Sequence, residues 1–312
     1  MRLKYPEQVI GAVSSSAPVQ AELNFKQFFD EITKTIGSDC ASNIRKATEQ
    51  LYSLIDDKNQ WIEIKNKLQL CENFDGNNKK DVSHLFFILA IPFHFLVATS
   101  ANQNDIQIAP YAKYNMKTVC EMMANESLGT EFDRYAAVNE LRLEVFNKTC
   151  TNFTHEYWTK LLQEIDYDKV ESLFSGERQR AYQRCNEFGS FKSSDSQNHP
   201  FGHSFPIKFF LDTCLEIFGK NFDAESVEKK VKFTNELYGG NKINVTNVIF
   251  TQGSLDPDHE LGVTNYTYSN STAILIDGAS LCSDTYSDSI NDSPQLKAAR
   301  EEISNFLGNL LK

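Results

Sequence analysis

The carboxyl-terminal part of the chain alternates strand-like runs, polar loops and one helix, and this order constrains the fold more than any other feature. Val245–Phe250 and Ala273–Ile276 are short, apolar and rich in β-branched residues, and a turn-forming segment follows each of them. A helix is predicted to begin after Ser293, a suitable N-cap, with Pro294 in its first turn. Strands connected in this way form a parallel α/β sheet, whose functional groups lie in loops beyond the carboxyl ends of the strands.

The preceding segments are mostly helical, with one further strand near the start. Val9–Val13 has the composition of a buried strand. From Phe25 to Tyr111 apolar residues recur at helical spacing, and 114–173 continues that pattern. Phe188–Pro206 is rich in Gly, Ser and Asp and is predicted to be a loop. The first apolar helix face comprises Phe25, Phe28, Phe29, Ile32 and Ile36.

Size and charge limit the classes of function. A chain of 312 residues with 41% apolar residues can bury a large core. The net charge is −11 and basic residues form no tract, so nucleic acid is not an expected partner.

One apolar stretch, Leu85–Ala101, resembles a membrane span. Its 17 residues fall short of the roughly 20 that cross a bilayer. Pro92 and His94 interrupt it, and neither end carries a clear basic flank. We therefore expect a buried, kinked helix and no membrane span.

Cysteines and glycosylation sequons point to an oxidising compartment. The seven cysteines are scattered, with no CxxC pair. Seven Asn-x-Ser/Thr sequons are expected to carry glycans: Asn125, Asn147, Asn152, Asn244, Asn265, Asn270 and Asn291. Both features suit a secreted or lysosomal protein. No signal peptide follows Met1, which contradicts secretion unless the amino end is missing.

Five motifs in order resemble one serine peptidase family, that of prolyl carboxypeptidase, dipeptidyl peptidase II and thymus-specific serine protease. They are KYPEQVIGAVSSSAPV, AYQRCNEFGSF, FGHSFPIKFFLDTC, GSLDPDHELG and GASLCSD. The resemblance implies an α/β-hydrolase fold, incomplete at the amino terminus, with an inserted helical cap. It divides the chain into a core remnant (1–22), the cap (23–112) and the carboxyl-terminal core (113–312). It implies no cofactor.

The resemblance also locates the catalytic positions. The family uses Ser, Asp and His in that order, and Asp256 in GSLDPD matches the acid. The histidine belongs in a Gly-x-x-His-x-x-Asp pattern, where this chain has Leu281. Leucine cannot accept a proton from a serine or pass one to a leaving group. The Gly-x-Ser-x-Gly elbow is absent from the chain and is expected upstream of Met1, so the chain reads as a fragment.

Two functions therefore compete. The first is a serine peptidase lineage with exopeptidase action on proline-linked peptides, in which this chain itself is inactive. The second is a secreted pseudo-peptidase that binds peptides or a partner without cleaving them. Peptides are the expected ligands in both cases, and a homodimer is an assembly that the sequence leaves open.

Other candidate groups have weaker patterns. Ser14–Ser16 lacks the glycines of an elbow, and Gly202–Pro206 is half of one, with Pro206 in place of the second glycine. The acidic loop Asp256–Glu260 has the residue types that hold a cation, but one short loop rarely supplies enough ligands, so no metal site is predicted. His259 within it is a conceivable base, although neighbouring positions in a tight loop point apart. Glu187 is a candidate either for meeting a substrate amine or for a structural hydrogen bond.

The resemblance suggests two disulfides, Cys185–Cys214 and Cys71–Cys120. Each would stabilise the fold by about 3–4 kcal/mol if it is unstrained. The pairing of the remaining cysteines is left open by the sequence. These are Cys40, Cys150 and Cys282.

Overall fold

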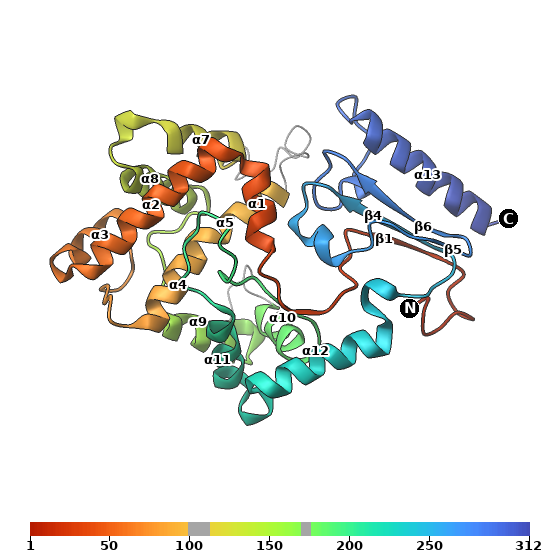
Figure 1. The fold of residues 1–312 in the computed structure, drawn as a ribbon, viewed down its shortest axis with the longest axis horizontal. Coiled ribbons are helices and arrows are strands. Elements are labelled where there is room, and N and C mark those ends of the chain that lie inside the picture. The colour runs from red at the N-terminus through yellow and green to blue at the C-terminus, as the bar shows by residue number, and fades with distance from the viewer. Residues whose placement is uncertain (99–112, 170–175) are drawn as a thin grey trace.

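The protein has a mixed α/β fold in which a small sheet adjoins a large block of helices (Figure 1). The structure is a computed structural model that describes residues 1–98, 113–169 and 176–312. The ends of two predicted helical segments, at 99–111 and 170–173, lie outside these residues. The predicted combination of a parallel sheet with many helices is confirmed.

The main sheet has four strands in the order β1-β4-β6-β5. They are β1 (Ala12–Ser15), β4 (Val248–Gly253), β6 (Ser271–Ile276) and β5 (Thr267–Tyr268). The first three run parallel, and every residue of β4 is buried, as expected for a central parallel strand. β5 is antiparallel to β6 because the two-residue turn Ser269–Asn270 has positive φ at both positions, which favours a hairpin.

The first strand lies later in the chain than the sequence predicted. The prediction placed it at Val9–Val13, whereas β1 spans Ala12–Ser15. The carbonyls of Val9 and Ile10 instead accept hydrogen bonds from the side chains of Arg2 (2.7 Å) and Asn247 (3.0 Å). These residues therefore form a turn leading into the sheet.

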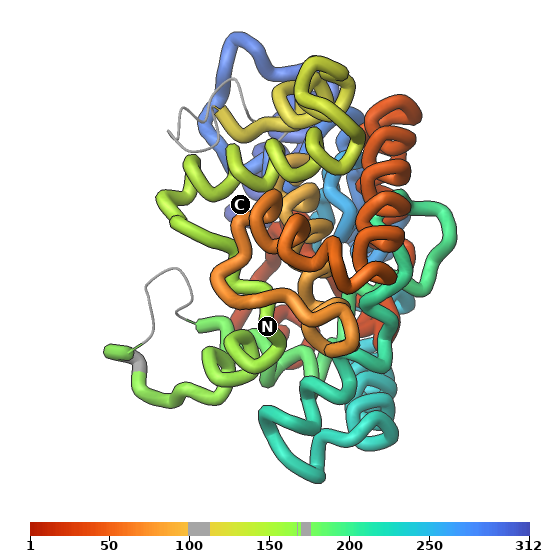
Figure 2. The backbone as a smooth tube through the Cα atoms, turned by 90° about the vertical axis from the view of Figure 1, so that its left-hand side faces the viewer, coloured from red at the N-terminus to blue at the C-terminus, as the bar shows by residue number. Residues whose placement is uncertain are grey.

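Eight helices of the described ranges form the block beside the sheet, and Figure 2 shows several of them in front of it. The apolar face predicted for the first of them is buried in the core of this block. Helix boundaries follow local signals; Thr130, for example, caps α8 with a reciprocal capping box to Asp133. The helices are α1 (Phe28–Ile36), α2 (Ser38–Asp56), α3 (Trp61–Lys67), α4 (Lys79–Ala90), α5 (Pro92–Ala98), α7 (Met116–Ala124), α8 (Glu131–Val145) and α9 (His155–Gln163).

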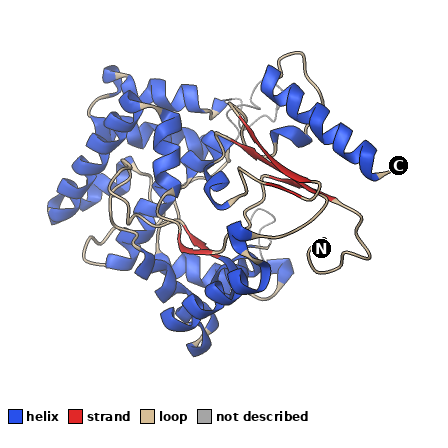
Figure 3. Cartoon of the chain, turned by 45° about the vertical axis from the view of Figure 1, so that its right-hand side comes forward, coloured by secondary structure: helices blue, strands red, loops and turns tan. Residues whose placement is uncertain are grey.

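A second, two-stranded sheet lies among the later helices (Figure 3). It pairs β2 (Glu22–Asn24) in parallel with β3 (Gly189–Phe191). β3 falls inside Phe188–Pro206, so the prediction of a continuous loop there was wrong. The accompanying helices are α10 (Glu177–Gln183), a π-helical turn (Arg184–Phe188), α11 (Ile207–Phe218) and α12 (Ala224–Tyr238). The last helix, α13 (Pro294–Leu310), lies instead against β6 of the main sheet.

The apolar stretch considered as a membrane span forms two helices, α4 and α5, which meet at Ile91 and Pro92. Its last three residues lie outside the described ranges. By length and composition Lys79–Ala98 could cross a membrane, and 56% of its most apolar window is buried inside the protein. Phe93, Leu96 and Val97 belong to the core of the helical block, which fits a kinked helix.

Three disulfides connect the described chain, and one predicted pairing was wrong. Cys185–Cys214 forms as expected. Cys71 does not pair with Cys120; it pairs with Cys150, while Cys120 pairs with Cys40.

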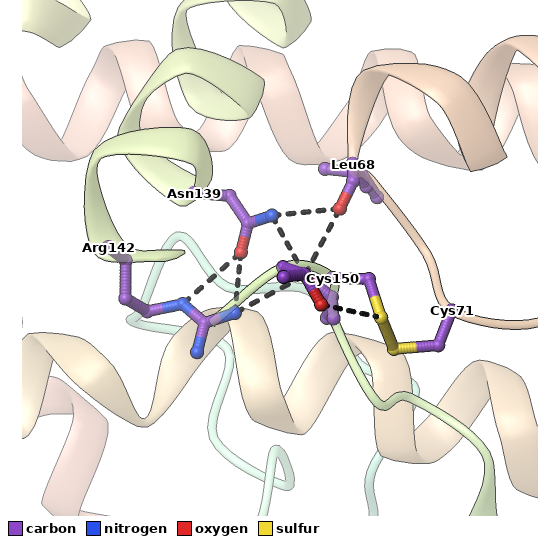
Figure 4. Close-up of a disulfide and its surroundings, with 7 residues drawn as sticks. Leu68, Cys71, Asn139, Arg142 and Cys150 are labelled. Carbon is purple, nitrogen blue, oxygen red and sulfur yellow. Dashed lines mark hydrogen bonds between the residues drawn. A yellow bond between two sulfur atoms is a disulfide. The ribbon is translucent and has the colours of Figure 1, made fainter. Parts of the chain in front are cut away.

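The Cys71–Cys150 pairing follows from the local backbone. Leu70 and Thr151 form a parallel bridge that holds the two cysteine segments side by side. Asn139 donates to the Leu68 carbonyl (2.9 Å) and accepts from Arg142 (2.8 Å) beside the disulfide (Figure 4).

Candidate active site

Two loops meet at the carboxyl edge of the main sheet. Ser254–Asp256 follows β4, and the segment from Asp277 follows β6. The Leu255 amide donates to the Ala279 carbonyl at 2.9 Å, so the two loops are hydrogen-bonded to each other. A Cβ at Gly253 would lie 2.5 Å from that same carbonyl oxygen, so glycine is needed for this close approach.

Asp256 is buried at the start of a short helical turn, Pro257–Leu261, which it caps. Its Oδ1 accepts the Asp258 amide at 3.0 Å. Its Oδ2 has no hydrogen-bond partner among the described residues. Burial, followed by the charge of Asp258, raises the pKa of the Asp256 carboxyl to about 6. One hydrogen bond at Oδ1 is therefore all that stabilises the charge of the carboxylate among the described residues.

Leu281 lies in the loop after β6, with about a third of its surface exposed. Its amide donates to the Ala98 carbonyl at 3.2 Å, which connects this loop to the end of α5. Asp284 fixes the same loop to the sheet by accepting from Ser15 Oγ (2.6 Å) and Thr251 Oγ1 (2.9 Å). The segment is thus well held, and its aliphatic side chain offers no proton chemistry.

Two histidines, His94 and His259, lie near Asp256 and Asp258. His259 Nδ1 lies 2.7 Å from the main-chain carbonyl of Asp256, and a carbonyl can only accept, so this nitrogen is the donor. His259 Nε2 faces Glu260 Oε1 at 3.4 Å. His94 Nε2 lies 3.8 Å from Asp258 Oδ2. Within the described chain, therefore, no imidazole is hydrogen-bonded to the Asp256 carboxylate.

Lys192 is a residue of this region that the sequence analysis missed. It follows β3, and its buried Nζ lies 3.5 Å from Asp258 Oδ2 and 3.7 Å from the centre of the Phe28 ring. Burial lowers the pKa of the Lys192 ammonium to about 8, an effect that Asp258 opposes. Only the fold brings α1, β3 and the β4 loop together, so no sequence signal marked this lysine.

The weaker candidates do not form a catalytic group. Ser14 and Ser15 belong to β1. His203, in the half-elbow motif, donates its amide to the Tyr52 hydroxyl at 2.8 Å within the helical block. Glu187 lies in the π-helical turn. Glu31, His259 and Glu260 place ligand atoms within 4.8 Å of one another, but Lys34 already forms an ion pair with Glu31.

Comparisons with known proteins give a consistent result. The family model described as "Serine carboxypeptidase S28" matches residues 1–303. A "Putative serine protease K12H4.7" of Caenorhabditis elegans is 25% identical over 99% of this chain and 61% of its own. "Thymus-specific serine protease" of Mus musculus is 27% identical over 100% and 61%. "Lysosomal Pro-X carboxypeptidase" of Bos taurus is 25% identical over 100% and 62%. The chain thus spans about three fifths of the length of these relatives.

Proposed function

The chain belongs to the serine carboxypeptidase S28 family, and on this premise we propose that it is a member that does not cleave peptides by itself. The finer architecture is part of the proposal. Residues 1–22 and 113–312 would be parts of an α/β-hydrolase core, and 23–112 its helical cap. The parallel strands β1, β4 and β6 and the adjoining helices support this assignment.

One combination of residues carries the proposal: Asp256, which by resemblance is the triad acid, and Leu281 at the position of the family's histidine. Asp256 lies in the loop beyond β4, and its Oδ2 is buried without a partner within the described chain. Leu281, which the resemblance places at the family's histidine position, lies in the loop beyond β6. Removing a triad member typically lowers turnover by about 10⁴-fold or more. The same side chain would stop catalysis in any longer form of the protein.

A second candidate function is peptide binding without cleavage. A buried lysine beside an aspartate and an aromatic ring persists at the sheet edge, although Leu281 removes the general base. The groups that bind a peptide do not depend on the catalytic histidine, so a site of this kind still binds peptides when hydrolysis is lost. We therefore favour a pseudo-peptidase that binds peptides.

We further propose that the protein is glycosylated and is secreted or lysosomal. All seven sequon asparagines are exposed in the structure. The three disulfides add support, because such bonds persist in oxidising compartments. A homodimer stays a proposal that a measurement of molar mass in solution would test.

An activity-based probe tests the loss of catalysis. The purified protein should show no labelling by a fluorophosphonate and no release of a dye from proline-linked dipeptide substrates, beside an active family member as positive control. Labelling at the rate of that enzyme would contradict the proposal. A rate of dye release proportional to the protein concentration would also contradict it.

A further inference from the structure

Glu31, His259 and Glu260 bring three metal-ligating side chains together beside the candidate site. One ligand atom of each residue lies within 4.8 Å of those of the other two. The sequence predicted no metal site in the acidic loop, because one short loop rarely supplies enough ligands. The fold removes this objection, since Glu31 comes from α1 and joins His259 and Glu260 of the turn after β4.

The main-chain carbonyl of Asp256 determines which ring nitrogen of His259 carries the proton. Nδ1 lies 2.7 Å from that oxygen and donates to it, so Nε2 of the neutral imidazole is an acceptor. Nε2 faces Glu260 Oε1 at 3.4 Å, and an ionised carboxylate also only accepts. Two acceptors that face each other need a positive charge between them, either a proton or a metal ion. Metal-binding histidines are commonly held in this way, with the other ring nitrogen donating to a carbonyl.

The spacing of these atoms fits a zinc ion. With Zn–N and Zn–O bonds of about 2.0–2.1 Å, two ligands of a tetrahedral site lie about 3.3–3.4 Å apart. His259 Nε2 and Glu260 Oε1 are 3.4 Å apart, and a small rotation of the Glu31 side chain would complete three bonds. The Glu260 side chain is 44% exposed, so water can reach a fourth position. An imidazole ligand favours zinc over magnesium and calcium, which prefer oxygen ligands.

Lys34 is the counter-charge that a metal ion would displace. Its ammonium hydrogen-bonds to Oε1 of Glu31, and its side chain is 70% exposed. Oε2 of Glu31 makes no hydrogen bond within the described chain. The hydrogen bond to Glu31, followed by the charges of Glu31 and Glu260, raises the pKa of Lys34, an effect that burial opposes. The lysine thus occupies one of the four carboxylate oxygens and can move into solvent.

We propose that Glu31, His259 and Glu260 bind one Zn²⁺ ion, which joins α1 of the helical block to the turn after β4. The two carboxylates balance the charge of the ion, and the imidazole supplies its nitrogen ligand. Asp256 caps the same turn, so the ion would stiffen the loop that carries this acid. The site does not depend on the proposed binding of peptides.

Calorimetric titration of the metal-free chain with zinc chloride at pH 7.5 tests the site. Wild type should bind one zinc ion per chain. His259→Gln should weaken binding at least about tenfold, because residues that only orient a ligand already change metal affinity by about 10–100-fold. Glu31→Gln should weaken it to a similar extent, although Glu31 lies in a different element. Lys34→Gln removes the competing ammonium and should tighten binding by about fivefold, a gain that misfolding cannot produce.

Two control variants detect adventitious binding elsewhere. His203→Gln removes an exposed imidazole of the helical block, and Cys282→Ser removes the free thiol. Both should keep the wild-type affinity. Co²⁺ in place of zinc should give visible absorption bands without a sulfur-to-metal charge-transfer band. Thermal unfolding and circular dichroism of each variant establish that it is folded.

Each result supports or overturns the metal site, whatever the outcome for peptide binding. An absence of zinc binding up to about 1 mM would assign a proton to His259 Nε2 and refute the site. Wild-type affinity in His259→Gln and Glu31→Gln would place the ion elsewhere and also refute it. Displacement of zinc by an equal concentration of Ca²⁺ would reject zinc and assign the cluster to a cation that prefers oxygen ligands.

Discussion

Replacing Asp256 by asparagine should change how the stability of the protein depends on pH. Burial shifts the pKa of this carboxyl from its ordinary 3.8 to about 6. One pKa unit corresponds to about 1.4 kcal/mol, so ionising the buried group costs about 3 kcal/mol of folding free energy. The amide introduced by Asp256→Asn would carry no charge and keep an oxygen that can accept from the Asp258 main-chain N–H.

The sign follows from linkage. The folded state binds the Asp256 proton more tightly than the unfolded state does, so this carboxyl favours folding below about pH 4. The benefit falls as the pH rises through 6. Asp256→Asn should therefore diverge from wild type as the pH rises from about 4 to 6, gain up to about 3 kcal/mol relative to it, and run parallel to it above about pH 7. If burying the asparagine amide costs free energy, that cost would lower the unfolding free energy of Asp256→Asn by the same amount at every pH.

Urea unfolding between pH 4.0 and 7.5 at constant ionic strength measures the difference. The exposed Asp39→Asn serves as the control and should run parallel to wild type, because its carboxyl lies in solvent on α2. Parallel curves for wild type and Asp256→Asn would refute the reasoning. They would mean that a proton donor satisfies Oδ2 in solution.

Three other substitutions test the site and the fold. Leu281→His should give Asp256 a donor and lower the pKa of its carboxyl, which urea unfolding would register as a shallower loss of stability between pH 4 and 6. Cys185→Ser with Cys214→Ser should lower the free energy of unfolding by about 3–4 kcal/mol in denaturant titrations, since the disulfide closes a loop of 29 residues. Ser293→Ala should cost about 1 kcal/mol by the same assay, because Ser293 Oγ caps α13 through the Leu296 amide; no change would show that the cap is dispensable.

Local signals in the sequence predicted the features that depend on neighbouring residues. Helical spacing identified the buried face at Phe28 and Ile32, and Ser293 marked the start of α13. The sequence could not fix what depends on distant segments. The start of β1 is set by side chains of Arg2 and Asn247, and the partner of Cys71 by a backbone bridge to 151.

The same distinction between local signals and contacts with distant segments applies to the candidate site. The positions of Asp256 and Leu281 in loops after strands could be predicted, because each follows an apolar run. Lys192 could not, because it lies in a Ser-rich segment and acquires its setting from Phe28, far away in the chain. A buried lysine in such a segment carries no periodicity that distinguishes it from a surface residue.

Asp256 has a structural role that is independent of the proposed triad. Its Oδ1 caps the turn Pro257–Leu261 by accepting the Asp258 amide, and Leu261 at the end of that turn packs in the core of the helical block. An alanine here would remove the cap, at a cost of about 1 kcal/mol, and leave the partly buried Asp258 amide without this acceptor. The acceptor at position 256 is therefore useful to the fold whether or not it supports catalysis, and the Leu281 contact with Ala98 is made by the main chain. On the proposed loss of catalysis, this cap explains why a side-chain oxygen acceptor is kept at position 256.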